Sequence, residues 1–137
     1  MTTAARKTVL VVDDDRDVRA TFTDALESEG YCVVTAADGL EALEWLTRAQ
    51  ATGASLPDVI LLDLQMPKMG GAELRARIGA EPAFDAIPVV ALSGEMAPPT
   101  ASTPAVRPPG DPAYAGTLHK PIALDALLAV VCAHCRA

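Results

Sequence analysis

Short apolar runs alternate along this chain with segments whose apolar residues recur at helical spacing, and this alternation restricts the folds the chain can adopt. The segments 9–12, 58–64 and 87–93 each contain a run of four apolar residues. Such runs are typical of strands buried on both faces, as in a parallel sheet. Weaker strand candidates lie at 31–36 and 117–119. The pattern predicts an α/β fold in which helices cover both faces of a doubly wound parallel sheet.

Helices are expected between these strands and after the last one. The first helix ends near Gly30, and the apolar residues of its buried face are Val18, Phe22, Ala25 and Leu26. The second begins at the N-cap Asp38, leaves Trp45 partly exposed and carries a stripe of Leu40, Leu43 and Leu46. The apolar residues of a shorter third helix and of the last helix are Leu74, Ile78, Leu124, Leu127, Leu128 and Val131.

The segment 94–112, GEMAPPTASTPAVRPPGDP, interrupts the alternation. It holds six of the eleven prolines of the chain. Proline lacks a backbone donor and clashes with the preceding turn, so this segment is not expected to form a regular helix. Its composition alone fits either a linker between two domains or a loop inside one domain.

Composition excludes several classes of function. The net charge of −7 and the pI near 4.6 argue against nucleic-acid binding, which needs clustered basic side chains. The N-terminus lacks the apolar core of a signal peptide, and no apolar stretch reaches membrane-spanning length, so a cytoplasmic protein is expected. Cysteine occurs three times, and reduced thiols are expected. The length favours one domain spanning 1–137.

Polar side chains occur where the predicted strands end. They are Asp13, Asp14, Asp63, Ser93 and Lys120. In an open parallel sheet, functional groups gather at the carboxyl ends of the strands, and a doubly wound sheet makes the first and third strands neighbours. The three aspartates are therefore expected to converge and to repel one another unless a cation lies between them.

A hard divalent ion, Mg²⁺, suits a site of oxygen ligands with room for water. The charges of three carboxylates are balanced by such an ion together with Lys120, so the site can receive a phosphoryl group. An aspartate is a competent phosphoryl acceptor when a metal and a cation bind the transferred oxygens. Alone, an aspartate after a strand is as often a helix N-cap, an interpretation that suits Asp15 or Asp17.

The ordered motifs resemble the receiver domain of bacterial two-component response regulators, the CheY-like superfamily. The matching segments are VLVVDDD (9–15), ADGLEAL (37–43), PDVILLDLQMPKMGG (57–71), IPVVALSG (87–94) and HKP (119–121). The resemblance covers about 7–131 and implies a flavodoxin-like sheet of five strands in the order 2-1-3-4-5. It also implies that this is a phosphoacceptor in a phosphorelay and not an enzyme, although it assists its own phosphorylation and dephosphorylation.

The same resemblance implies a role for each site residue. Asp63 would take the phosphoryl group from a phosphohistidine of a sensor histidine kinase or a histidine phosphotransfer protein, and the domain would then switch its binding to an output protein. Asp14 and Asp63 would bind Mg²⁺ directly, Asp13 would act mainly through water, and the Gln65 backbone carbonyl would complete the protein ligands. Ser93 would contact the phosphoryl group and report its presence, and Lys120 would pair with it.

The sequence departs from the family pattern on its output side. Thr117 occupies the position where the family usually carries a switch aromatic. The prolines occupy the place of the fourth helix, so a loop at about 95–116 is expected there, and dimerisation through the usual fourth-helix face is not. Because Lys120 follows this segment and must lie beside Asp63, the segment is expected inside one domain.

Two other functions fit parts of the pattern. A pseudo-receiver would keep the fold and bind a protein partner without phosphorylation, which the altered fourth-helix region favours and the Asp63, Ser93 and Lys120 set disfavours. A phosphatase of the haloacid-dehalogenase type would need a second aspartate two residues after the nucleophile, where this chain has Gln65.

Overall fold

Parallel pairing joins all the strands found in the computed structural model, which describes residues 7–54, 56–64, 71–93, 115–119 and 122–134. The strands are β1 (Thr8–Val12), β2 (Cys32–Ala36), β3 (Val59–Asp63), β4 (Val89–Ser93) and β5 (Gly116–His119). They form one five-stranded sheet in the order β2-β1-β3-β4-β5. The predicted parallel sheet and its strand order are therefore confirmed.

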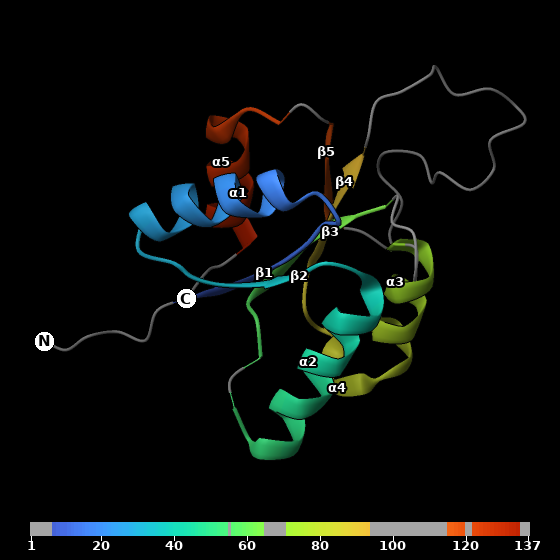
Figure 1. Cartoon of the computed structure of the whole chain (residues 1–137). Coiled ribbons are helices and arrows are strands. Elements are labelled where there is room, and N and C mark those ends of the chain that lie inside the picture. Colours follow the sequence, from blue (N-terminus) through green and yellow to red (C-terminus); the bar gives the residue numbers. More distant parts are fainter. Residues whose placement is uncertain (1–6, 55, 65–70, 94–114, 120–121, 135–137) are drawn as a thin grey trace, which may run out of the picture.

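Helices cover both faces of this sheet, as predicted (Figure 1). They are α1 (Arg16–Ser28), α2 (Gly39–Thr52), α3 (Gly71–Ala80), α4 (Pro82–Asp85) and α5 (Leu124–His134). The helices α1 and α5 pack on one face, and α2, α3 and α4 pack on the other. The label α4 belongs to a four-residue helix before β4, and the helix that the family places between β4 and β5 is a different element.

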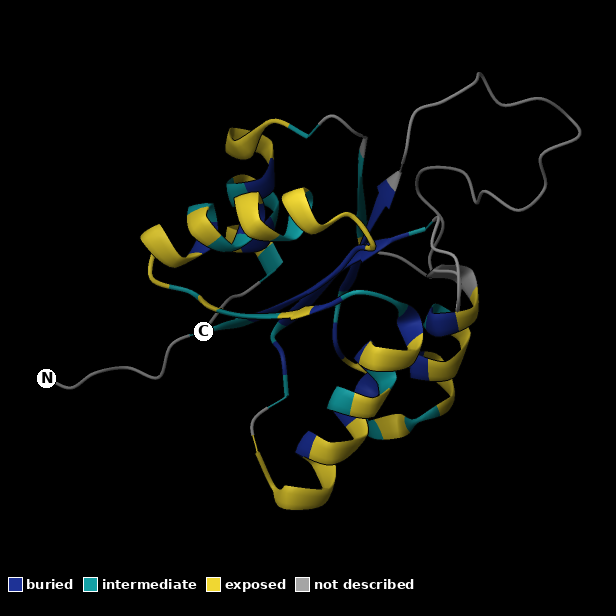
Figure 2. Cartoon of the chain, viewed as in Figure 1, coloured by how far each residue is buried: buried dark blue, intermediate teal, exposed yellow. Residues whose placement is uncertain are grey.

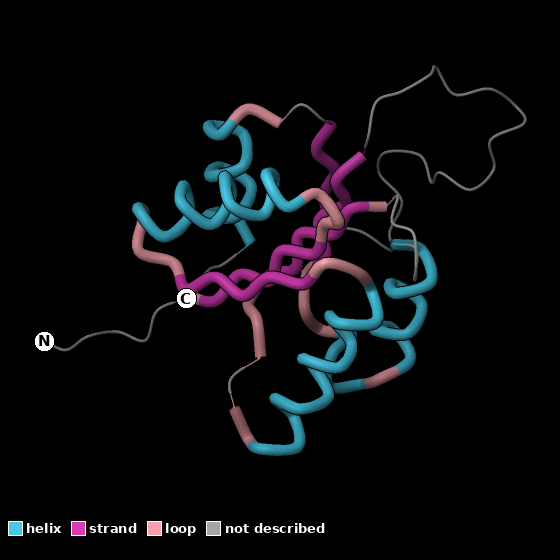
Figure 3. The backbone as a smooth tube through the Cα atoms, viewed as in Figure 1, coloured by secondary structure: helices cyan, strands magenta, loops and turns pink. Residues whose placement is uncertain are grey.

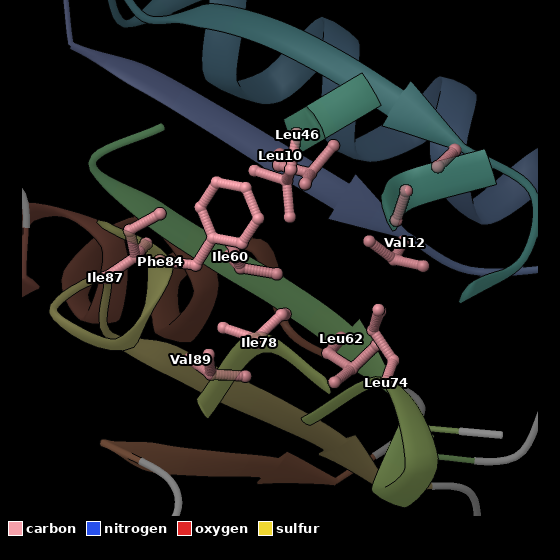
Figure 4. Packing of buried hydrophobic residues seen from close by; sticks show 12 residues of the cluster. Leu10, Val12, Leu46, Ile60, Leu62, Leu74, Ile78, Phe84, Ile87 and Val89 are labelled. Carbon is pink, nitrogen blue, oxygen red and sulfur yellow. The ribbon is translucent and has the colours of Figure 1, made fainter. Parts of the chain in front are cut away.

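Alternate residues of each central strand supply the two halves of the core. Leu10 and Ile60 face α2, α3 and α4, where Leu46, Ile78 and Phe84 meet them (Figure 4). Their neighbours Val9 and Leu61 face α1 and α5. The central strands β1, β3 and β4 are therefore buried on both faces, while the helices expose their outer sides (Figure 2). Each fully buried aliphatic side chain contributes roughly 1.5–3 kcal/mol to stability.

The ends of α1 and α2 follow from local residues. The side chain of Asp15 accepts hydrogen bonds from the backbone nitrogens of Asp17 and Val18, so Asp15 is the N-cap of α1. Asp38 caps α2 in the same way, as predicted, by accepting from the nitrogen of Glu41 at 2.8 Å. Helix α2 ends at Gly53, whose φ of 78° is a left-handed conformation that favours glycine.

The predicted stripe on α2 is wrong at its first residue. Leu40 is 48% exposed, and the buried residues of the helix are Gly39, Ala42, Leu46 and Ala49. A residue turns about 100° around a helix, so leucines spaced by three drift about 60° at each step, whereas a spacing of four then three keeps one face. Leu40 thus leaves the face that Leu46 occupies. Trp45 is partly buried and packs against the core, which agrees with the prediction.

One prediction cannot be compared with the fold. The segment in which a proline-rich loop is expected to replace a helix, about 95–116, lies outside the described residues except at its last two positions. There, the nitrogen of Ala115 donates to the carbonyl of Val89 at 2.8 Å, and Gly116 begins β5.

Candidate functional site

The end of β1 places a buried carboxylate at the edge of the sheet. Asp13 follows Val12, the last residue of β1, and is 0% exposed. Its nitrogen donates to the carbonyl of Ala36 in β2 at 3.1 Å, and its Oδ1 accepts from the nitrogen of Asp15 at 2.9 Å. The Asp13 carboxylate is thus fixed by the neighbouring strand and by the turn into α1.

The end of β3 places a second carboxylate beside the first. Val12 pairs with Leu62, so the next residues in the same parallel register are Asp13 and Asp63. Asp63 is the last residue of β3, is 3% exposed and pairs on its other side with Leu92 of β4. Since β3 is hydrogen-bonded to β1 on one side and to β4 on the other, strand pairing fixes the backbone position of Asp63.

The two strand ends form a cluster of three carboxylates. One oxygen each of Asp13, Asp14 and Asp63 lies within 4.8 Å of the others, and Asp14 is exposed. The carboxyl ends of β1 and β3 lie side by side at the same end of the sheet (Figure 3). Two unit charges at this separation repel by about 3.5 kcal/mol at an effective dielectric constant near 20, so the cluster favours a cation. Its oxygen-only donors suit a hard divalent ion such as Mg²⁺ or Ca²⁺.

The remaining predicted site residues are only partly placed. Ser93 ends β4 and pairs with His119 of β5, which puts its backbone at the edge of the sheet that carries Asp63. Thr117 lies in β5, pairs with Ala91 and is half-buried. Gln65 and Lys120 lie outside the described residues, as does the side chain of Ser93. The carboxylates are brought together, and the roles of the other residues stay predictions.

A further side chain at this site was not singled out from the sequence. The Nη1 of Arg19 donates to the backbone carbonyl of Asp13 at 2.7 Å. The contact joins the first turn of α1 to the residue that precedes Asp14. Only the position of Arg19, one helical turn after the capping Asp15, could have suggested it, and that spacing alone does not determine which group the side chain reaches.

Other features of the described residues bear on function. Among them, the aspartates at the ends of β1 and β3 are the only group of three or more His, Cys, Asp or Glu side chains that lie close enough to share an ion. Cys32 and Cys132 are free thiols, as expected for reduced cysteines. No helix in the described ranges is both long enough and apolar enough to cross a membrane.

Comparison with known proteins is consistent with this geometry. The family model of the response regulator receiver domain matches residues 9–132. The response regulator MprA of Mycobacterium leprae is 35% identical over 122 residues, which are 88% of this chain and 47% of MprA. The chain spans two thirds or less of the length of the first curated relatives that it matches.

Solved structures show the same fold. The chemotaxis protein CheY4 of Vibrio cholerae superimposes with a TM-score of 0.73 and 32% identity, covering 93% of this chain and 97% of that chain. The phosphorylated cyanobacterial phytochrome response regulator RcpA superimposes with a TM-score of 0.60 and 38% identity, over 68% of this chain and 69% of its own.

Proposed function

The chain belongs to the family of response regulator receiver domains of two-component signalling, and from this premise we propose that Asp63 is its phosphoryl acceptor. The observation that carries the proposal is the cluster itself. Asp63 is 3% exposed and lies within 4.8 Å of two further carboxylates at the end of the central strand. A cluster of this kind, which is electrostatically unfavourable without a cation, is suited to bind one and to present a carboxylate oxygen to phosphorus.

In the proposed step, a carboxylate oxygen of Asp63 attacks the phosphorus of a phosphohistidine. The O–P bond forms as the N–P bond breaks, the imidazole leaves with the bonding electron pair, and an acyl phosphate remains on Asp63. Because Asp63 is held on both sides by strand pairing, its oxygen is presented without much motion of the backbone. The phosphorylated relative RcpA, at 38% identity, supports this chemistry.

Mg²⁺ suits the oxygen donors of Asp13, Asp14 and Asp63. Asp14 and Asp63 would bind it directly, Asp13 would act through water, and the Gln65 backbone carbonyl would complete the protein ligands. When bound, the ion neutralises charge on the transferred phosphoryl oxygens. Asp14 is the exposed member, so it faces the side from which a donor can approach. Lys120 is proposed to pair with the phosphoryl group, and the Ser93 hydroxyl to donate a hydrogen bond to it.

The proposed partners are a sensor histidine kinase or histidine phosphotransfer protein as donor, and an output protein as receiver of the signal. The domain is proposed to act as a phosphoacceptor that assists its own phosphorylation and dephosphorylation. Receiver domains interact with sensor kinases and output proteins as a family, and the proposal extends that role to this chain.

Intact mass spectrometry after incubation with Mg²⁺ and acetyl phosphate tests the proposal. We expect a single added phosphoryl group on the wild type, no adduct in the presence of EDTA, and no adduct on Asp63→Asn. Asp24→Asn is the matched control, because it removes the same charge at an exposed position of α1 and should be phosphorylated normally. A wild type that takes up no phosphoryl group would contradict the proposal and favour the pseudo-receiver, and an adduct that survives in Asp63→Asn would show that another residue is the acceptor.

A further inference from the structure

We propose that Arg19 is a positioning residue for the carboxylate cluster, holding the peptide between Asp13 and Asp14 so that both carboxylates are directed toward Asp63. The inference rests on the proposed function, since it concerns the same site. Its basis is the 2.7 Å hydrogen bond from Nη1 of Arg19 to the carbonyl of Asp13. A hydrogen bond from a charged guanidinium is short and about twice as strong as a neutral one.

This contact acts on the orientation of Asp14. The carbonyl of Asp13 and the nitrogen of Asp14 belong to one planar peptide, so fixing the direction of the carbonyl fixes the plane from which Asp14 continues. Asp14 is the exposed member of the cluster, and its carboxylate lies in the turn outside the sheet ladder. Arg19 is thus placed to restrain the cluster member that the strands hold least.

Arg19 is itself anchored by the turn that it restrains. Its backbone nitrogen donates to the carbonyl of Asp15 at 3.1 Å, while the Asp15 side chain caps the first turn of α1. Asp13 is held by Ala36 on the strand side and by the nitrogen of Asp15 on the turn side. The guanidinium supplies a further attachment, from the helix, to Asp13, the cluster member that directly follows β1.

A positioning role can be separated from a role as a nearby charge. If Arg19 acted only through its charge, its removal would strengthen the binding of every divalent cation, because a competing positive charge would be lost. If it orients the Asp13–Asp14 peptide, its removal weakens binding. The loss should be larger for Mg²⁺, which demands near-ideal octahedral ligand positions, than for Ca²⁺, which accepts irregular ones.

The experiment is isothermal titration calorimetry of the full chain with Mg²⁺ and with Ca²⁺, without a phosphodonor. Arg19→Met keeps most of the side-chain length and removes the hydrogen-bond donors, whereas Arg19→Lys keeps a positive charge and a donor. The control Arg16→Met removes a positive charge from an exposed residue of the same helix. We expect Arg19→Met to weaken Mg²⁺ binding by roughly tenfold, in the range found for residues that orient metal ligands. Ca²⁺ binding should fall less, Arg19→Lys should recover part of the Mg²⁺ affinity, and Arg16→Met should stay within about twofold of the wild type.

Equal or tighter Mg²⁺ binding by Arg19→Met would overturn the proposal, as would an equal loss for both ions. If Arg19→Met does not fold, as judged by circular dichroism in EDTA, the comparison of Mg²⁺ with Ca²⁺ in Arg19→Lys decides the question by the same criterion. Normal phosphorylation of the wild type together with unchanged metal binding in the Arg19 variants would refute this inference alone. A wild type that neither binds Mg²⁺ nor accepts phosphoryl groups would overturn the proposed function as well.

Discussion

Replacing Asp63 with asparagine should stabilise the metal-free fold, although it removes the proposed phosphorylation site. Asp13 and Asp63 are 0% and 3% exposed, and their carboxylate oxygens lie within 4.8 Å of each other. At that distance the repulsion between two unit charges is about 3.5 kcal/mol at an effective dielectric constant near 20. Asparagine keeps the size of the side chain and one oxygen acceptor while removing the charge.

The gain is reduced by whatever hydrogen bonding the Asp63 carboxylate makes as a charged acceptor, a loss of about 1.5 kcal/mol. The net stabilisation should therefore be about 2 kcal/mol, which raises the melting midpoint of a domain of this size by roughly 8 °C. Exposed Asp14 is screened by solvent and is left out of this figure.

Thermal melts followed by circular dichroism in EDTA at low salt measure the effect. Asp24→Asn, which makes the same change at an exposed position on α1, should shift the midpoint little. In Mg²⁺ at ten times its dissociation constant, the wild type should gain about 1.4 kcal/mol and Asp63→Asn much less, because only the former keeps the full ligand set. The reasoning fails if Asp63→Asn melts no higher than the wild type in EDTA, or if Asp24→Asn rises equally.

Three further substitutions test the description of the fold by urea unfolding. Leu61→Ala removes a fully buried side chain from the centre of β3 and should lower the free energy of unfolding by about 2–5 kcal/mol, whereas Leu40→Ala, at a residue 48% exposed, should lower it by less than about 1 kcal/mol; equal losses would show that the face assigned to α2 is wrong. Gly53→Ala should lower it by roughly 1 kcal/mol through backbone strain alone, since φ is 78° and an added Cβ meets nothing within 4 Å; an unchanged midpoint would show that the helix ends differently.

The strands could be predicted from the sequence to within about two residues because their signal is local. A run such as that of β3, whose residues are all buried, can be satisfied only between two helical layers. The strand order was less accessible. No pattern within β1 identifies β2 and β3 as its neighbours. The strand order was predicted from the resemblance of the ordered motifs to a known family.

The helices show where a local pattern misleads. The leucines of α2 are predicted to form its buried face because they are large and apolar. The buried face also contains small residues such as Ala42 and Ala49, which lie four residues before and three residues after Leu46. The short helix α4 was not predicted at all. It has only four residues, Pro82–Asp85, and its N-cap Glu81 makes no side-chain capping bond, so neither periodicity nor a cap marks it.

The part of the site that could be predicted is the convergence of carboxylates at the carboxyl ends of neighbouring strands. Asp13 and Asp63 converge because parallel strands carry their carboxyl ends to one edge, which requires only the identity of the strands and their adjacency. The contact of Arg19 with the carbonyl of Asp13 depends on the path of a long side chain across a helical turn. No spacing rule determines that path, so the residue could be recognised only from the structure.

The position of the cluster explains how a fold can tolerate such repulsion. Asp13 follows β1 and Asp63 ends β3, and core residues of both strands, including Val12 and Leu62, are completely buried. Separating the carboxylates would therefore disturb paired backbone on both sides of β3. The packing of the core therefore prevents the two carboxylates from moving apart. Their repulsion can instead be relieved by a bound cation. The nitrogen of Leu64, the residue after Asp63, donates to the carbonyl of Leu92, the residue before Ser93. This bond ties the residue after Asp63 directly to the backbone of β4, which pairs in turn with β5.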